Sequence, residues 1–140
     1  AREEGIANVE IITADMNDFT IDDRFDRAIS IEMFEHMKNY EELLGRVAGF
    51  LVDDGLLFLH VFAHRRYAYH YVAAGPEDWM ARHFFTGGTM PSWDLLPSFD
   101  RDFELVERWQ VDGTHYEKTS NAWLENMDRR AFDKALQHDE

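Results

Sequence analysis

The chain has 140 residues, enough for one small domain with its own core, and its formal net charge of −14 argues against a nucleic-acid partner, because an acidic surface repels phosphate. It contains no cysteine, which excludes disulfides and thiolate metal sites and fits a reducing, cytoplasmic location. No apolar run approaches the roughly 20 residues of a membrane-spanning helix, so no transmembrane segment is expected.

The first half of the chain alternates predicted strands with one predicted helix. The β-branched run VEIIT at residues 9–13 predicts a strand, and FDRAISI at 25–31 predicts a second. Apolar residues at the spacing of one helix face predict an amphipathic helix over 40–51, ended by VDDG at 52–55. The nearly all-apolar LLFLHVF at 56–62 predicts a strand covered on both faces. This order is typical of an α/β fold with a parallel sheet and right-handed connections.

The second half of the chain is less regular. Residues 65–99 are rich in aromatic residues and interrupted by glycine and proline, which predicts short helices and loops that form a cap over a site. FELVERWQV at 103–111 predicts a further strand, and a final helix is predicted from Ser120. At the opposite end, AREEG indicates the last turn of a helix that stops at Gly5. We therefore expect the chain to be a piece of a longer protein.

Acidic and histidine side chains follow the predicted strands at the point where ligands bind in such sheets. Glu32, Glu35 and His36 come directly after the second strand, and His60 and His64 lie near the end of the next. A carboxylate beside a histidine can act as a general base or a proton relay. Acidic residues also favour the first turn of a helix, where they meet its dipole. Spacing alone leaves both interpretations open.

Metal and nucleotide signatures are weak in this sequence. On a strand, His60 and His64 would stand about 13 Å apart, too far to share one ion, so no metal site is predicted. The sequence has no GxGxxG or Walker loop, and FTGGTM does not join a strand to a helix. Either the protein binds no nucleotide-like cofactor, or the glycine loop lies upstream of Ala1.

Four segments of the chain resemble a known family. They are FDRAISIEMFEHMKNYEELL, DDGLLFLHVF, EDWMARHFFTGGTMPS and GTHYEKTSNAWLENMD. They resemble S-adenosylmethionine-dependent methyltransferases of the cyclopropane-fatty-acid synthase superfamily, and are most similar to the branch that includes coclaurine N-methyltransferase. The resemblance implies an incomplete class I methyltransferase (Rossmann-like) sheet with helices on its faces. Residues 1–140 would then be a partial methyltransferase domain with a cap insertion at about 65–99, lacking the N-terminal glycine loop and the last strand.

The resemblance also implies a place for S-adenosylmethionine. Asp15 and Met16 match positions that line the adenine pocket, where a carboxylate can accept a hydrogen bond from the exocyclic amine. An Asx turn after a strand is the alternative explanation of Asp15, and the cofactor role is favoured because the end of the strand faces the ligand-binding edge. The backbone at Ser30 and Ile31 would pass under the methionine part of the cofactor.

Further residues match the family's active site. Glu35 and His36 match its EH pair, and His60 and Tyr116 match other active-site positions. In the fatty-acid branch Glu35, His60 and Tyr116 would hold a bicarbonate that acts as base, although His60 could equally be a satisfied core histidine and Tyr116 a packing residue. Glu32 is a second carboxylate where the fatty-acid enzymes usually have a small residue, and this matches the N-methyltransferase branch.

Three functions are therefore in competition. The leading hypothesis is methyl transfer to a small amine, which must lose a proton before its lone pair can attack, with Glu32, Glu35 and His36 binding and deprotonating it. The second is methylene transfer to an unsaturated acyl chain of a lipid. The third is a non-catalytic fragment or binding module. In the enzyme hypotheses the cap would shape an apolar substrate pocket with its aromatic residues Trp79, Phe84, Phe85 and Trp93.

Overall fold

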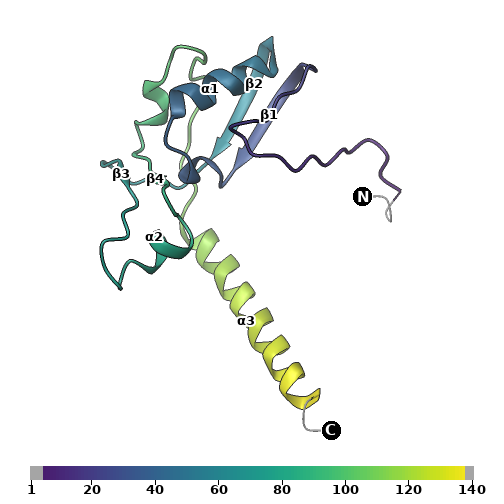
Figure 1. Cartoon of the computed structure of the whole chain (residues 1–140), viewed down its shortest axis with the longest axis vertical. Helices are drawn as coiled ribbons and strands as arrows, with labels where there is room; N and C mark the ends of the chain where they lie inside the picture. Colours follow the sequence, from purple (N-terminus) through teal and green to yellow (C-terminus); the bar gives the residue numbers. More distant parts are fainter. Residues whose placement is uncertain (1–4, 138–140) are drawn as a thin grey trace. The chain divides into compact units, whose positions relative to one another are not determined.

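The computed structural model describes residues 5–137, with side chains up to residue 130, as two compact units. The first unit lies within residues 1–104 and the second within residues 105–140. Figure 1 labels the helices and strands of both units. The helix end predicted before Gly5 falls outside the described residues.

The centre of the first unit is a pair of parallel strands with one crossover helix. Strand β1 (Phe25–Ile31) pairs with β2 (Leu51–His60) in parallel, and Ile31 stands opposite His60 at the carboxyl ends. Helix α1 (Tyr40–Gly49) joins the two strands and covers one face of the pair (Figure 1). The predicted strand–helix–strand unit is confirmed, with β1 at its predicted residues.

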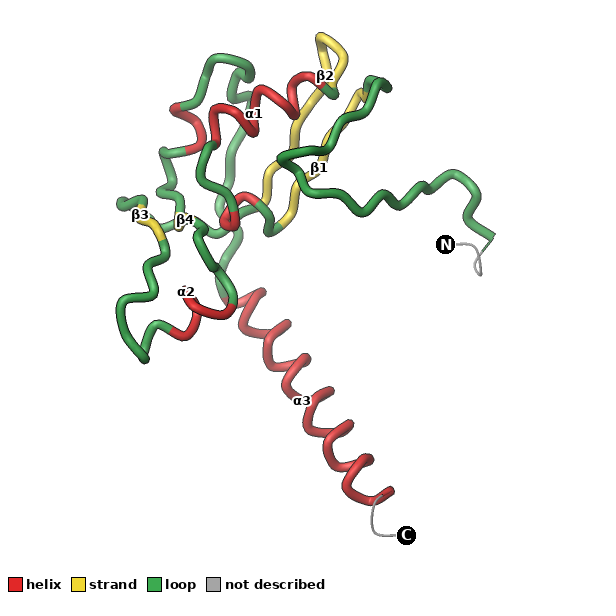
Figure 2. Tube along the Cα trace, viewed as in Figure 1, coloured by secondary structure: helices red, strands yellow, loops and turns green. Residues whose placement is uncertain are grey.

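The turn predicted at residues 52–55 is absorbed into β2. Phe25 pairs with Leu51 but Arg27 already pairs with Leu56, so β2 makes an excursion of several residues that β1 does not follow. Figure 2 shows the chain turning back on itself within this yellow segment. A Cβ at Gly55 would come within 2.9 Å of the Val52 carbonyl oxygen, so the tight excursion requires glycine. The helix thus ends at Gly49, before the predicted Leu51.

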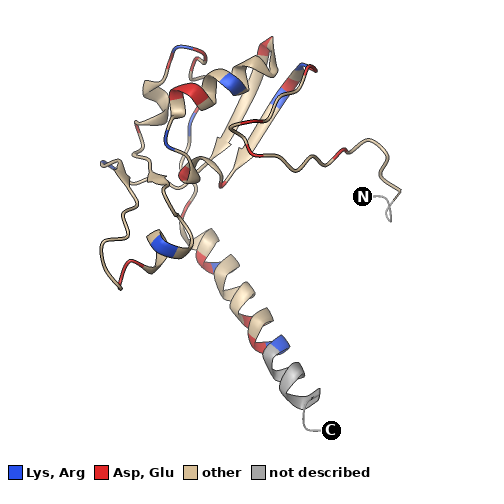
Figure 3. Ribbon diagram, in the orientation of Figure 1, with Lys and Arg blue, Asp and Glu red and all other residues tan. Residues whose placement is uncertain are grey.

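The core of the first unit lies between α1 and the covered face of the sheet. Asn39 begins the helix by accepting a hydrogen bond from the Glu42 backbone N–H at 3.4 Å. Acidic residues occupy the first turn and Arg46 the last, as the helix dipole favours (Figure 3). The buried apolar side chains are Phe34, Tyr40, Leu43, Leu44, Val47 and Leu51.

The opposite face of the two strands is apolar and open. Leu57 and Leu59 pack against the core. Leu56 and Phe58 alternate with them along the strand and are 47% and 37% exposed. Ile29 on the neighbouring strand is 71% exposed. The prediction that residues 56–62 are covered on both faces is therefore wrong for the described chain, because α1 covers only one face.

Two predicted strands are absent from the described residues. Residues 9–13 and 103–111 have the composition of strands but form no ladder, and Ile11 and Val106 are both 81% exposed. A strand exists only where a neighbour accepts and donates its backbone hydrogen bonds. Among the residues that the structure describes, these two segments therefore lack the paired ladder that a strand requires.

Residues 65–99, the segment predicted to form a cap, consist of short elements. Strand β3 (Tyr69–His70) pairs antiparallel with β4 (Thr89–Met90), and helix α2 (Trp79–His83) lies in the connection between them. A 3-10 helix, η2 (Leu96–Ser98), follows. The short helices and loops agree with the prediction, whereas the small strand pair was not predicted.

The second unit contains one long helix, α3 (Thr114–Gln137), which begins six residues before the predicted Ser120. Asp112 sets this start, because its carboxylate accepts a hydrogen bond from the Thr114 backbone N–H at 2.8 Å. The same bond lowers the pKa of Asp112. No helix in the described part of the chain combines the length and apolar character needed to cross a bilayer.

Candidate functional site

The candidate site begins where β1 ends, at an unusual backbone conformation. Glu32 has φ of +54°, and no other described residue except glycine has a positive φ. Its backbone N–H donates to the His60 carbonyl oxygen at 3.0 Å, which extends the parallel pairing by one residue. Such a left-handed conformation is unfavourable for a residue with a side chain and persists where the surroundings hold it, often at functional sites.

Glu32 and His60 are in polar contact at the carboxyl edge of the sheet. The Glu32 Oε1 atom lies 2.7 Å from His60 Nδ1, and the two side chains are about one third and two fifths exposed. Burial, and then the negative charge of Glu35, raise the pKa of Glu32, while His60 and His36 oppose the shift. A raised pKa brings this carboxylate closer to the range where it can exchange a proton at neutral pH.

Glu35 is the most deeply buried charged group of the site. It lies in the 3-10 turn η1 (Phe34–His36) and is 1% exposed. One carboxylate oxygen, Oε1, accepts a hydrogen bond from the Phe62 backbone N–H at 2.9 Å. The other, Oε2, is shielded from solvent and has no hydrogen-bond partner among the described residues. A buried carboxylate oxygen without a donor is unfavourable for folding alone, so this atom is a candidate for ligand binding.

His36 lies against the aromatic side chains of the cap. Its ring centroid is 5.3 Å from that of Phe85, which is 7% exposed, and 5.8 Å from that of Phe84. Trp79 instead packs on His83 and is 59% exposed. Residues 32–36 form the acidic turn. Of the aromatic residues predicted to shape the pocket, Phe84 and Phe85 therefore contact this turn, and Trp79 does not.

The cap contacts the acidic turn at Gly88, a role that was not predicted from the sequence. A Cβ at Gly88 would overlap the carbonyl oxygen of Glu35 and come within 3.2 Å of the His36 Cα atom. The Gly88 N–H donates to the Phe85 carbonyl oxygen at 3.0 Å. Only glycine allows this approach of two backbones. The paired glycines of the FTGG segment are the sequence signal of this close approach.

The structure places the predicted cofactor residues in different environments. The Asp15 Oδ1 atom accepts hydrogen bonds from the backbone and side-chain nitrogens of Asn17, both at 2.8 Å, so the Asx turn is present. Met16 packs against the core of the first unit. The Ser30 hydroxyl is buried without a partner among the described residues, and Ile31 lies 61% exposed at the end of β1.

The two remaining predicted residues have partners within their own units. His64 accepts hydrogen bonds through Nδ1 from the backbone N–H groups of Arg66 and Tyr67, and so stabilises a turn. Tyr116 lies on α3 in the second unit, where its ring meets Trp123 edge-on at 6.1 Å. The part assigned to Tyr116 in the site stays a prediction.

Comparison with known proteins gives three related matches. The family model described as mycolic acid cyclopropane synthetase matches residues 1–140. (S)-coclaurine N-methyltransferase of Papaver somniferum is 38% identical over 130 residues, which cover 91% of this chain and 37% of the relative. A solved structure of coclaurine N-methyltransferase bound to N-methylheliamine and SAH superposes with a TM-score of 0.81 at 35% identity, covering 91% of this chain and 40% of that one.

A relative of a second kind is similar to this chain at lower sequence identity. Cyclopropane-fatty-acyl-phospholipid synthase of Escherichia coli (strain K12) is 29% identical over 128 residues, which cover 90% of this chain and 31% of the relative. The chain therefore spans between 31% and 40% of the length of these relatives. At 35% identity, the solved match establishes the methyltransferase fold for the aligned part of the chain.

Proposed function

Because the chain belongs to the mycolic acid cyclopropane synthetase family along residues 1–140, we propose that the protein containing it is an S-adenosylmethionine-dependent methyltransferase that methylates a small amine. The observation that carries this proposal is the pair of carboxylates, Glu32 and Glu35, on one turn at the carboxyl edge of the β1–β2 pair. An amine arrives mostly protonated at neutral pH, and two carboxylates suit an ammonium group better than one.

The chain's own residues would bind the acceptor and remove its proton. The unpartnered Glu35 Oε2 can accept a hydrogen bond from the ammonium group. Glu32, with its raised pKa and its contact to His60, can take up a proton and pass it towards solvent, since both side chains are partly exposed. His36 and the rings packed on it limit water around the nucleophile. These groups would leave the nitrogen lone pair free and oriented for the methyl group that the cofactor would supply.

Residues of this chain also suit the adenosyl and methionine parts of the cofactor. When bound, S-adenosylmethionine supplies an activated methyl group on a sulfonium. Asp15, Met16, Ser30 and Ile31 would contact it, and the buried Ser30 hydroxyl without a protein partner supports this assignment, because a ligand can supply the missing hydrogen bond. We place the reaction in the cytoplasm, in keeping with a chain that has no cysteine.

Methyl-transfer assays test the proposal directly. The protein is expressed from its complete coding sequence and incubated with radiolabelled S-adenosylmethionine and either small amines or phospholipid vesicles. We expect label in the amines. Label in lipid alone would contradict the proposal.

Methylene transfer to an unsaturated acyl chain is the second candidate. The match to cyclopropane-fatty-acyl-phospholipid synthase favours it, and the Glu35 Oε2 atom with His60 could help hold a bicarbonate. The alkene needs a base only after it has attacked the methyl group, to remove a proton from the carbocation. Activity that depends on added bicarbonate, with label in lipid, would support this function.

The third candidate is a binding module without catalysis. Isothermal titration with S-adenosylhomocysteine compares the 140-residue chain with the protein from the complete coding sequence. We expect weak or no binding by the chain alone, because its open apolar face, which includes Ile29 and Leu56, favours aggregation. Tight binding by the chain alone would show that this reasoning is wrong.

A further inference from the structure

The hydroxyl of Tyr71, in the cap, is a buried polar group with no role in the steps above. The oxygen is shielded from solvent and makes no hydrogen bond with any residue that the structure describes. Burying a hydroxyl without a partner is unfavourable, and such groups in native proteins usually bind water or a ligand. The Tyr71 hydroxyl therefore needs an explanation beyond packing.

Glu35 presents the complementary unsatisfied atom. Its Oε2 is also shielded and without a partner among the described residues, on a side chain that is 1% exposed. The Glu35 charge is one of the smaller causes of the raised pKa of Tyr71, and no hydrogen bond joins the two groups. A third polar group lying between the two atoms would satisfy both.

The position of the Tyr71 ring is fixed relative to Glu35. Its backbone N–H donates to the Gly88 carbonyl oxygen at 3.1 Å, and Gly88 itself lies against the Glu35 backbone. The ring stacks on Phe85 at 4.5 Å with an interplanar angle of 9°, and Phe85 stacks on His36. The stack holds the hydroxyl in place without any bond to the oxygen itself.

The hydroxyl is neutral under physiological conditions. Burial raises the pKa of Tyr71 to about 12, with smaller contributions from Tyr69 and Glu35. A neutral phenol can accept a hydrogen bond from an N–H group while its own proton remains available as a donor.

We propose that the acceptor nitrogen binds between Glu35 Oε2 and the Tyr71 hydroxyl, and that Tyr71 favours amines that keep an N–H after deprotonation; this inference rests on the amine methylation proposed above. A secondary ammonium has two N–H groups. The N–H that faces Glu35 loses its proton, which Glu32 takes up, and the remaining N–H donates to the Tyr71 oxygen, which orients the lone pair for attack. The new N–C bond forms as the C–S bond breaks, and the product is a tertiary ammonium.

A tertiary amine lacks this second contact. Its ammonium has one N–H, which is lost to the carboxylate before attack, so nothing remains to donate to Tyr71. The hydroxyl should therefore contribute to catalysis with primary and secondary amines and not with tertiary ones.

The test is the variant Tyr71→Phe, which removes the hydroxyl and keeps the ring stack. Tyr69→Phe is the matched control, because Tyr69 lies edge-on to Tyr71 at 5.9 Å but is 47% exposed. Parent and variants, expressed from the complete coding sequence, are assayed with N-methylbenzylamine, tetrahydroisoquinoline and their N-methyl derivatives. Tm, affinity for S-adenosylhomocysteine and binding of the secondary amines by titration are measured alongside.

We expect Tyr71→Phe to lower kcat/KM and binding affinity for the secondary amines roughly tenfold, with the tertiary amines, Tm and S-adenosylhomocysteine affinity unchanged. Tyr69→Phe should match the parent throughout. Parental kinetics in Tyr71→Phe, or an equal loss with both amine classes, would overturn the inference while leaving amine methylation intact. A parent protein that methylates none of these amines would overturn the proposed function itself.

Discussion

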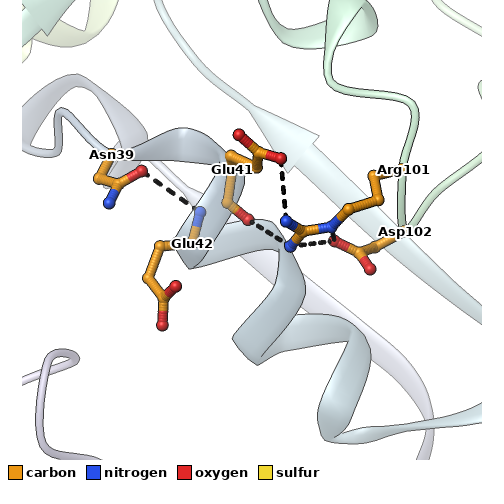
Figure 4. A network of polar contacts seen from close by, with 5 residues as sticks. All are labelled: Asn39, Glu41, Glu42, Arg101 and Asp102. Atoms are coloured by element: carbon orange, nitrogen blue, oxygen red, sulfur yellow. Dashed lines mark hydrogen bonds and ion pairs between the residues drawn. The ribbon is translucent and has the colours of Figure 1, made fainter.

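Two polar clusters of the first unit contain the same kinds of side chain in opposite surroundings. At the carboxyl edge of the sheet, Glu35 is buried and Glu32 is partly buried beside His60. On the outer side of α1, Arg101 binds Glu41 and Asp102, and the Arg101 and Glu41 side chains are more than half exposed to solvent (Figure 4). The groups of the first cluster are proposed to act in catalysis, whereas those of the second only connect a loop to a helix.

In the exposed cluster, each nitrogen of the Arg101 guanidinium donates a hydrogen bond. Arg101 donates to the Glu41 carboxylate at 2.9 Å and to the Glu41 backbone oxygen at 3.3 Å, and its Nε donates to Asp102 at 2.8 Å. Exposed ion pairs of this kind contribute little to stability because water screens them. In the buried cluster, by contrast, one Glu35 oxygen has no protein donor among the described residues. An unsatisfied group in a protected place, and not the number of charges, distinguishes the candidate site.

The largest expected effect comes from Glu35→Gln. Replacing the buried carboxylate by a neutral amide should lower kcat/KM for amine methylation by about a hundredfold or more. The amide is of similar size, so Tm and S-adenosylhomocysteine affinity should change little. Full activity in Glu35→Gln would remove the distinction between the two clusters.

Glu32→Gln should have a smaller, pH-dependent effect. Glu32 accepts a proton only when ionised, and its pKa is raised, so parental kcat/KM should fall as the pH decreases through a value above that of an ordinary glutamate. The variant should lose roughly tenfold at neutral pH, and the deficit should shrink at high pH, where solution deprotonates the amine. A pH–rate profile measures this, and a deficit constant across pH would count against proton transfer.

Gly88→Ala tests whether the cap positions the buried cluster. The added Cβ would overlap the Glu35 carbonyl oxygen, so we expect a loss of stability of about 1–3 kcal/mol and a lower kcat. Gly75→Ala is the control in the same cap, because its Cβ would meet only the Asp78 carboxylate at 3.8 Å. Thermal unfolding of both variants gives the comparison, and equal Tm values would show that the cap yields at Gly88.

Arg101→Ala should have the smallest effect. It removes the exposed cluster at its centre, and we expect Tm and kcat/KM to remain within experimental error of the parent, because water screens these pairs. Increasing the salt concentration should leave the parent equally unchanged. A clear loss of activity in Arg101→Ala would mean that the outer loop also supports the site.

Several elements were predictable because their signals are local. β1 follows from the segment FDRAISI after a group of turn residues, and α1 follows from the spacing of Tyr40, Leu43, Leu44 and Val47, all of which are buried. The strand order predicted that Glu32, Glu35 and His60 would meet at one edge of the sheet, and the structure brings them there. Strand pairing and helix packing dictate that meeting through periodicities of two and 3.6 residues, which a single sequence displays.

The sequence by itself determined the order of strands and helix, and with it the edge where the acidic residues gather. Only the tertiary structure decided that residues 9–13 and 103–111 stay outside any described sheet, since pairing depends on a neighbour and not on composition. The tertiary structure also decided which polar atoms are buried away from solvent. The environment of Glu35 is made by groups that are far from it in the sequence: Gly88, the Phe62 N–H and the Tyr71 hydroxyl. Such contacts depend on tertiary packing, which no local sequence pattern records.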